Sequence, residues 1–355
     1  MKKILTYILS LLVFTGCIQE DSFDNNAIGN FDALWSIIDQ HYCFFDYAEK
    51  EYGLDWDAVY NKYRPMISEE TTDEELFDIL GNTLAELRDG HVNLSSIYGI
   101  TYYRDWSITH PINFSDSIQR NYLGTDFRTN NGIKFQTLLP DSIGYMYVSS
   151  FSSSLGSGNI SHILAKMGRC PGLIIDIRGN GGGMITSAET LASHFTDKEA
   201  LVGYMLHKTG IGHDDFSQPE EMRLKPAKGA IWLRPTVVLT NRGVFSAANY
   251  FVMMMRSLPS PYIAILGDKT GGGSGMPLNS TLPNGWHLRY SACPMLDTEG
   301  KHTEFGIDPD IRVDITSEDW DKGRDTMIEA ARQYIKLIYQ NLENSEKQEY
   351  ETIKF

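Results

Sequence analysis

The chain has few cysteines, and their spacing suggests no stabilising framework. Only four occur in 355 residues, at Cys17, Cys43, Cys170 and Cys293. If Cys17 has the separate role argued below, an odd number is left, and none of these residues has the close spacing of zinc ligands. The sequence therefore argues against a disulfide-stapled scaffold and predicts no metal site. The three remaining thiols are expected to be buried as apolar side chains.

Positive charge is also scarce. Lys and Arg total 31 against 46 Asp and Glu, which gives a formal net charge of −15. Binding to phosphate backbones or to anionic membrane surfaces relies on clustered Lys and Arg, so we expect no nucleic-acid partner. The apolar share of 42% and the charged share of 22% are close to globular averages. The composition thus indicates a folded body that is neither disordered nor a multi-span membrane protein.

Long apolar runs are missing except at the start of the chain. The segment MKKILTYILSLLVFTGC has two lysines and then an apolar run from Ile4 to Phe14. This run is short for a membrane span and is typical of an export signal. Its ending, FTGC, is similar to the lipobox of bacterial lipoproteins, in which the cysteine is lipidated. Acyl chains on Cys17 would provide an anchor without a transmembrane helix. The alternative is an ordinary signal peptide with a chance cysteine.

These features predict a signal peptide over residues 1–17 and a polar, acidic tether over residues 18–30. We expect an exported outer-membrane lipoprotein of a Gram-negative bacterium. Its N-terminal lipid would hold it to the membrane, on either the periplasmic or the cell-surface face.

Apolar spacing predicts an N-terminal helical subdomain over residues 31–98. Apolar residues recur there every three or four positions, as they do on one face of a helix. Thr72 and Glu75 have the spacing of a capping box at the start of the last helix, and Asp89-Gly90 ends it. His91 therefore lies at the exit of a well-defined helix.

The rest of the chain divides into three parts. Residues 99–142 have no strong period and are predicted to form a bridging segment with short strands. Residues 143–338 alternate buried apolar strands with helices, which indicates an α/β layered core. A last helix from Thr326 to about Leu342 leads into a charged tail over residues 339–355, which is expected to fray.

The first motif that could carry chemistry is GLIIDIRGNGGG, from Gly172 to Gly183. A buried strand breaks there into a glycine-rich turn, where backbone N–H groups can approach a ligand closely and point at negative charge. The turn could serve a nucleotide or an oxyanion. No GK[ST] follows, and the spacing is not that of a dinucleotide fingerprint. The alternative is a plain strand-to-helix turn pinned by an ion pair between Asp176 and Arg178.

The second motif is VVLTNRGVFSAANYFVMMM, from Val237 to Met255, in which Ser246 opens a helix. A serine at this place is most often an N-cap. It could also be a nucleophile, because the amide of Ala247 is free at the helix start and can donate to an oxyanion. Ser246 does not lie in the G-x-S-x-G elbow of the α/β-hydrolases.

Two further residues say little on their own. His91 follows a helix-stopping glycine, and a single histidine usually has a structural role. Glu304 lies in KHTEFGIDPDIRV before a turn, where exposed glutamates are common. Only partners elsewhere in the chain would give either residue a chemical role.

Together these stretches resemble the C-terminal-processing, or tail-specific, serine peptidase family. The resemblance runs from about Phe31 to Tyr334 and rests on seven stretches in order: FDALWSIIDQHY, LRDGHVNL, IGYMYVSSF, LIIDIRGNGGG, TNRGVFSAANYF, LGDKTGGGSG and EFGIDPDIRV. The family resembles the ClpP and crotonase proteins. The resemblance therefore implies an α/β fold with a spiralled β-β-α core behind the N-terminal helical subdomain.

Within that family the sequence resembles the tricorn-core-like branch. The tail-specific branch uses a Ser/Lys dyad, but its lysine position falls on Gly273 here, and Lys269 is an improbable substitute. The tricorn-core-like branch uses serine, histidine and glutamate, which match Ser246, His91 and Glu304. A further serine of that branch, just before the histidine, falls on Gly90 in this chain.

The resemblance implies a serine peptidase mechanism without a metal or organic cofactor. His91 would act as general base for Ser246, and Glu304 would orient the imidazole. The amides of Ala247 and of Gly181 or Gly182 would form the oxyanion hole. Only about 45 residues separate Tyr98 from Ile143. This is too few for the PDZ module of tail-specific members, so we expect peptides or unfolded proteins as substrates, with endo- and exopeptidase action both open.

The competing hypothesis is a non-catalytic lipoprotein that binds an apolar ligand or a peptide on the same fold. The run Met253-Met254-Met255 could line its cleft, although methionines on a helix are more often core residues. The complete set of Ser246, His91 and Glu304 favours the enzyme, because a pure binder has no reason to keep it. An esterase would differ from the peptidase only in the leaving group.

Overall fold

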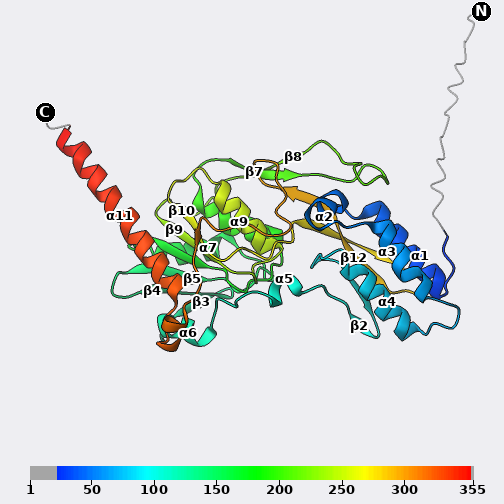
Figure 1. The fold of residues 1–355 in the computed structure, drawn as a ribbon. Coiled ribbons are helices and arrows are strands. Elements are labelled where there is room, and N and C mark those ends of the chain that lie inside the picture. Colours follow the sequence, from blue (N-terminus) through cyan, green and yellow to red (C-terminus); the bar gives the residue numbers. More distant parts are fainter. Residues whose placement is uncertain (1–21, 353–355) are drawn as a thin grey trace, which may run out of the picture.

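A computed structural model describes residues 22–352. An N-terminal group of helices lies beside an α/β core, and the long C-terminal helix projects from the opposite end of the molecule (Figure 1). The predicted signal peptide, with Cys17 and the first part of the tether, lies outside the described residues.

The N-terminal helices begin earlier than the sequence predicted. α1 starts at Ala27, inside the segment assigned to the tether, because the side chain of Asn26 caps it by accepting from the Gly29 amide. The predicted capping box of Thr72 and Glu75 is present at the start of α4. The elements are α1 (Ala27–His41), α2 (Phe45–Tyr52), α3 (Trp56–Tyr63), the short 3-10 helix η1 (Arg64–Met66) and α4 (Asp73–Ala85).

The core is built on a seven-stranded sheet with the order β13-β10-β9-β6-β5-β4-β3. The strands from β5 to β13 run parallel, while β4 and β3 add an antiparallel edge. Since β3 and β4 belong to this sheet, the core begins within the predicted bridging segment. The strands are β3 (Arg128–Asn130), β4 (Ile133–Leu138), β5 (Ile143–Tyr147), β6 (Leu173–Asp176), β9 (Thr236–Thr240), β10 (Ile263–Gly267) and β13 (Ile311–Arg312).

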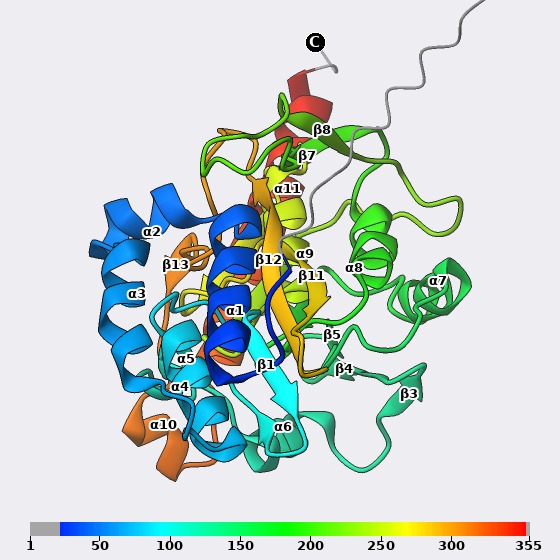
Figure 2. The same cartoon turned by 90° about the vertical axis from the view of Figure 1, so that its right-hand side faces the viewer.

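A second, antiparallel sheet joins the core to the N-terminal helices. Its order is β2-β1-β12-β7-β8, and β11 also pairs with β12. Leu288 and Tyr290 of β12 are buried in one apolar cluster with the N-terminal helices, and α1 lies against this strand (Figure 2). The strands are β1 (Asn93–Ser96), β2 (Gly99–Ile100), β7 (Ala200–Met205), β8 (Glu220–Leu224), β11 (Gly275–Thr281) and β12 (His287–Leu296).

Helices cover both faces of the seven-stranded sheet. Side chains of α7, α8 and α9 pack on one face around Ile175 and Val238, and α11 packs on the other around Ile174 and Val237. The helices are α7 (Ser157–Lys166), α8 (Ile185–Ala192) with the short η2 (Ser193–Phe195), α9 (Ala247–Ser257) and α11 (Thr326–Thr352). Three short ones, α5 (Asp105–Ile108), α6 (Asp116–Leu123) and α10 (Ser317–Asp321), lie in connections.

This architecture confirms the predicted α/β fold, with its ClpP/crotonase-like core and N-terminal helical subdomain. The last helix was predicted too short, because α11 continues to Thr352 and includes most of the charged tail. Cys43 and Cys170 are buried as predicted, but Cys293 is only half-buried. Within residues 22–352, no helix is both long and apolar enough to span a membrane.

Candidate active site

Ser246 lies at the junction between β9 and α9 in an unusual backbone conformation. Its φ of 58° and ψ of −125° fall outside the regions that serine ordinarily adopts, and its side chain makes no capping hydrogen bond. Ser246 thus occupies the N-cap position of α9, but its side chain does not serve as the cap. The conformation is fixed from both sides, because the Ser246 amide donates to Gly272 O at 2.9 Å and the Phe245 amide donates to Asn180 O at 3.0 Å. Strain held in this way is often found at functional sites.

His91 contacts Ser246 from the segment that follows α4. The chain after α4 positions it, because the His91 amide donates to the Asp89 carboxylate at 2.7 Å. The atoms His91 Nε2 and Ser246 Oγ are 2.9 Å apart, within hydrogen-bond distance. Two residues 155 positions apart in the sequence are thus brought together, as the resemblance implied.

The environment of His91 favours the neutral imidazole. The side chain is only 7% exposed. Burial lowers the pKa of His91 below its ordinary value, and the nearby Arg289 cation acts in the same direction, while the Asp89 carboxylate opposes both. A neutral imidazole can accept the serine proton at Nε2, provided that Nδ1 carries the ring hydrogen.

An aromatic stack supports this pair. The Phe245 ring lies 4.7 Å from that of Trp106, nearly parallel to it, and 4.8 Å from that of His91. The same ring fills the space beside Gly273, where an added Cβ would lie 2.5 Å from it. A lysine at this position would therefore collide with Phe245. Lys269 does not line the cavity around Ser246.

Glu304 is close to this region but does not contact the His91 ring. Its carboxylate accepts from the amides of Ser274, at 2.7 Å, and Gly275, at 3.2 Å. His91 Nδ1 is buried and has no hydrogen-bond partner in the described part of the chain. Glu304, which the resemblance implied would orient the imidazole, therefore makes no hydrogen bond to His91 here, and both backbone amides donate to its Oε2.

Burial governs the charge of Glu304. The side chain is 3% exposed, and burial raises the pKa of Glu304 well above its usual range. The neighbouring Asp89 carboxylate raises it further, whereas the two backbone amides act in the opposite direction. Asp89 is itself buried and accepts from Ser291 Oγ at 2.7 Å. Asp89 and Glu304 are thus two buried acidic side chains that influence each other, and Asp89 also acts on His91.

The glycine turn after β6 packs directly against the serine. A Cβ on Gly182 would lie 2.8 Å from Ser246 Cβ and 2.9 Å from the Ala247 nitrogen. The Gly182 amide already donates to Asn180 Oδ1 at 2.9 Å. The amides of Gly181 and Ala247 donate to no group within residues 22–352. Of the two glycines that were predicted as alternatives, Gly181 is the one whose amide is free for an oxyanion.

The predicted ion pair of Asp176 and Arg178 is also present. Arg178 Nη2 lies 2.6 Å from Asp176 Oδ2, and Arg178 Nη1 lies 2.9 Å from Asp325 Oδ2, with all three side chains fully buried. This network ties the end of β6 to the start of α11. The prediction that an ion pair pins the turn is therefore confirmed. The same turn can also face Ser246, since the ion pair does not involve its glycines.

A cavity of about 540 Å³ opens in front of Ser246 and His91. The glycine turn and strands of the second sheet line it, so each half of the molecule contributes one wall. Met253, Met254 and Met255 do not line it; they are almost fully buried in the core. In the described part of the chain, no group of three or more His, Cys, Asp or Glu residues is arranged to hold a metal ion.

Three residues of this site were not marked by the sequence patterns. They are Phe245, Trp106 and Asn180, and each acts through a tertiary contact rather than through spacing along the chain. For Asn180, its place inside the glycine-rich turn was the one available signal.

Family models match two parts of the chain. Residues 142–313 match the model described as peptidase family S41, and residues 24–85 match the tricorn protease C1 domain. A crystal structure of a candidate peptidase from Parabacteroides merdae is 48% identical, with a TM-score of 0.83 over 88% of this chain and 97% of that one.

More distantly related proteases are also similar to this chain in sequence or in fold. The carboxy-terminal processing protease CtpA of Bacillus subtilis is 25% identical over 184 residues, which are 51% of this chain and 37% of that protein. The chain thus spans well under half the length of this curated relative. The structure of mature CPAF, at 12% identity, shares the fold with a TM-score of 0.67 over 90% of this chain and 98% of that one.

Proposed function

We propose, because the chain belongs to peptidase family S41, that it is an exported serine peptidase that cleaves peptides or unfolded proteins. The observation that carries the proposal is the 2.9 Å contact between His91 Nε2 and Ser246 Oγ. A serine that is held at a positive φ beside a buried, neutral imidazole is suited to act as a nucleophile.

Hydrolysis would proceed through an acyl-enzyme. His91 takes the proton of Ser246 Oγ as the oxygen attacks the peptide carbonyl, and the amides of Ala247 and Gly181 stabilise the tetrahedral oxyanion. The imidazolium then gives this proton to the leaving amine. In the second half a water molecule attacks the ester, with His91 again taking a proton and returning it to Ser246. No step requires a metal or an organic cofactor.

We assign Glu304 an electrostatic role in this cycle. Burial favours the neutral form of Glu304 in the resting site. The positive charge that forms on His91 shifts Glu304 toward its carboxylate, which then stabilises that charge even without a direct hydrogen bond. Because its carboxylate is held by the amides of Ser274 and Gly275, Glu304 stays fixed relative to the histidine.

Export and a lipid anchor at Cys17 are part of the proposal and rest on the sequence alone. The mass of the mature N-terminus, measured on protein from membranes, tests them. An unmodified N-terminus at another residue would contradict the anchor.

Labelling of residues 18–355 with a fluorescent fluorophosphonate tests the nucleophile. We expect the wild type and Lys269→Ala to be labelled, because Lys269 does not line the cavity. Ser246→Ala should not be labelled, and His91→Ala should be labelled far more slowly, since it lacks the general base. Equal labelling of Ser246→Ala, or no labelling of the wild type between about pH 6 and 9, would contradict the assignment and favour the binding-protein hypothesis.

A further inference from the structure

Arg289 lies in the wall of the cavity that contains Ser246 and His91. Along β12, Leu288 and Tyr290 are buried against the N-terminal helices, while His287 and Arg289 are exposed. Since side chains alternate between the two faces of a strand, Arg289 projects from the face opposite these helices. This is the face that borders the cavity.

The strands on either side of β12 place polar side chains beside this arginine. Arg289 pairs in register with Asn93 of β1 and with Asn279 of β11, so the three residues form a row across one face of the sheet. All three line the cavity. Asn93 is already engaged through its side-chain amide, which donates to His91 O at 3.0 Å, and this bond ties the row to the catalytic histidine.

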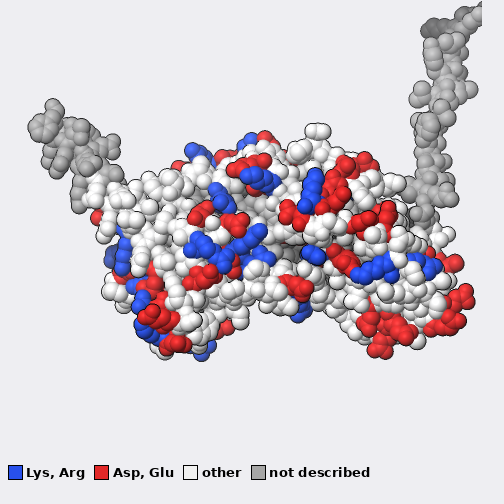
Figure 3. Space-filling view, in the orientation of Figure 1, with Lys and Arg blue, Asp and Glu red and all other residues white. Residues whose placement is uncertain are grey.

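The arginine has no partner for its charge. No ion pair or hydrogen bond of its guanidinium occurs in the described part of the chain, and no Asp or Glu lines this cavity. On the face shown in Figure 3, acidic side chains gather over the N-terminal helices.

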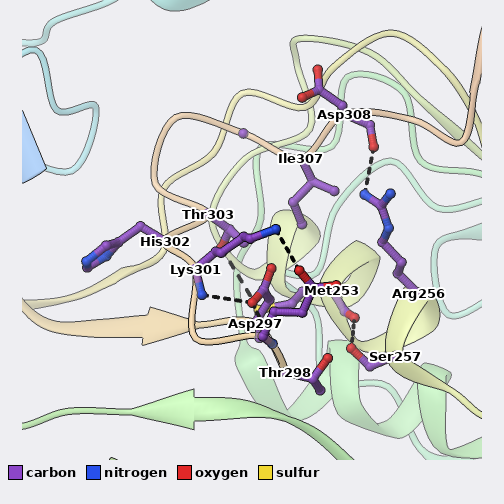
Figure 4. A pocket seen from close by; sticks show the side chains of 12 residues that line it. Met253, Arg256, Ser257, Asp297, Thr298, Lys301, His302, Thr303, Ile307 and Asp308 are labelled. Atoms are coloured by element: carbon purple, nitrogen blue, oxygen red, sulfur yellow. Dashed lines mark hydrogen bonds and ion pairs between the residues drawn. The ribbon is translucent and has the colours of Figure 1, made fainter. Parts of the chain in front are cut away.

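A second cavity, of about 440 Å³, shows the opposite arrangement. It is lined in part by Arg256 and Lys301 (Figure 4). Lys301 Nζ lies 2.6 Å from Glu299, and Arg256 Nη2 lies 3.2 Å from Asp310. The cations of this cavity are thus neutralised within the chain, whereas the charge of Arg289 remains available to a ligand.

We propose that Arg289 binds a carboxylate of the substrate while the neighbouring peptide bond lies at Ser246. The enzyme would then prefer peptides that carry a carboxylate close to the cleaved bond. The guanidinium can hold a carboxylate through two parallel N–H···O bonds, and the free side chain of Asn279 can add a third donor. The proposal rests on the proposed function for the position of the scissile bond, but the binding of a carboxylate does not require catalysis.

Two kinds of carboxylate have this chemistry: an Asp or Glu side chain, and the C-terminus of the substrate. The first would give an endopeptidase that selects acidic sequences, and the second an enzyme that cleaves near chain ends. Matched peptides separate them, because replacing Glu by Gln removes only the side-chain charge and a C-terminal amide removes only the terminal charge.

The test measures binding and cleavage separately. The substrates are fluorescein-labelled decapeptides with Glu or Gln at each position and with a free or an amidated C-terminus. Fluorescence anisotropy measures their binding to Ser246→Ala, and cleavage is measured with the wild type. Both experiments are repeated with Arg289→Gln, with Arg289→Lys, which keeps the charge, and with Arg256→Gln, which removes a cation from the other cavity.

We expect at least one carboxylate to tighten binding by about tenfold, as is typical of a charge-assisted hydrogen bond. The ratio of the affinities for the charged and the neutral peptide should fall close to one in Arg289→Gln. This ratio should remain in part in Arg289→Lys and be unchanged in Arg256→Gln. In cleavage, the same preference should appear mainly in KM. Equal binding of the charged and neutral peptides, or a preference that persists in Arg289→Gln, would overturn the proposal. Binding with this preference but without any hydrolysis would instead overturn the proposed function.

Discussion

The two sides of the candidate site differ in how firmly hydrogen bonds hold their residues. On the serine side, Ser246 is fixed by hydrogen bonds of its own amide and of the preceding one, and Gly182 packs against it. On the histidine side, the backbone of His91 is held by Asp89, but Nδ1 of its ring has no partner. The proposed nucleophile and oxyanion donors are therefore held in place by the backbone, whereas the His91 ring is oriented by its contact with Ser246 and by packing against Phe245.

This difference follows from the origin of the two walls. The serine wall belongs to the turns after two buried parallel strands, β6 and β9, which are neighbours in the sheet. The histidine wall belongs to strand β1 and the segment before it, and β1 is part of the second sheet. β6 pairs along its full length with both of its neighbours, whereas β1 pairs with each neighbour over only part of its length, so fewer backbone hydrogen bonds hold the loop beside β1.

The largest expected effect comes from disturbing the serine wall. Gly182→Ala should slow fluorophosphonate labelling and lower kcat by about 10²- to 10³-fold, because displacing the Ala247 amide has the effect of losing one oxyanion donor. The cause is steric, because Gly182 has a φ of +98° and an added Cβ would collide with Ser246 and Ala247. Single-turnover labelling rates measure the loss.

Gly181→Ala is the matched control for this change. An added Cβ on Gly181 meets no atom within 4 Å, and its amide is kept in the variant, so we expect a much smaller effect. Thermal melts check that both variants fold. If the two substitutions slowed labelling equally, the close approach of Gly182 to the serine would not be what matters.

A smaller effect is expected on the histidine side. Glu304→Gln keeps an oxygen for the amides of Ser274 and Gly275 but removes the carboxylate that can stabilise the imidazolium. We expect kcat to fall by about 10- to 100-fold, because one electrostatic contribution is lost while the base itself remains. KM should change little.

His91→Ala sets the scale for this prediction. If Glu304→Gln lost as much activity as His91→Ala, the carboxylate would have to bond the imidazole directly when substrate is bound. The site would then be rearranged relative to the resting arrangement, in which His91 Nδ1 has no partner.

The smallest expected effect is a displacement of the pH profile. Because burial and Arg289 lower the pKa of His91, the acid limb of kcat/KM should lie below the ordinary histidine value of 6.5. Arg289→Gln removes a cation that disfavours the imidazolium. The pKa of His91 then rises, and the acid limb moves to higher pH.

Arg289→Lys keeps the positive charge and should leave the limb near its wild-type position. The profiles are best measured with a neutral amidated peptide, so that substrate binding does not change with pH. A limb that stayed in place in Arg289→Gln, or moved to lower pH, would contradict this account of the pKa of His91.

The sequence alone predicted the α/β core, the N-terminal helical subdomain and the pairing of Ser246 with His91. Apolar periodicity specifies which elements form, since buried strands and amphipathic helices leave regular patterns. The motifs around His91, Gly181 and Ser246 lie at the ends of elements, and the order of these motifs along the chain carried the family resemblance that implied their roles. Element ends were predicted less well, as α1 and α11 show.

Only the tertiary structure decided how these residues act on one another. Three contacts join segments distant in sequence: the bond from Ser246 to His91, the packing of the Phe245 ring beside Gly273, and the amides that donate to Glu304 Oε2. The choice of Gly181 over Gly182 as oxyanion donor depends on the side chain of Asn180, which bonds one amide and leaves the other free. Arg289 gained a possible role only when the pairing of β1, β12 and β11 brought it beside the cleft. Spacing along a chain fixes local conformation, whereas which groups share a cavity is set by packing among distant segments.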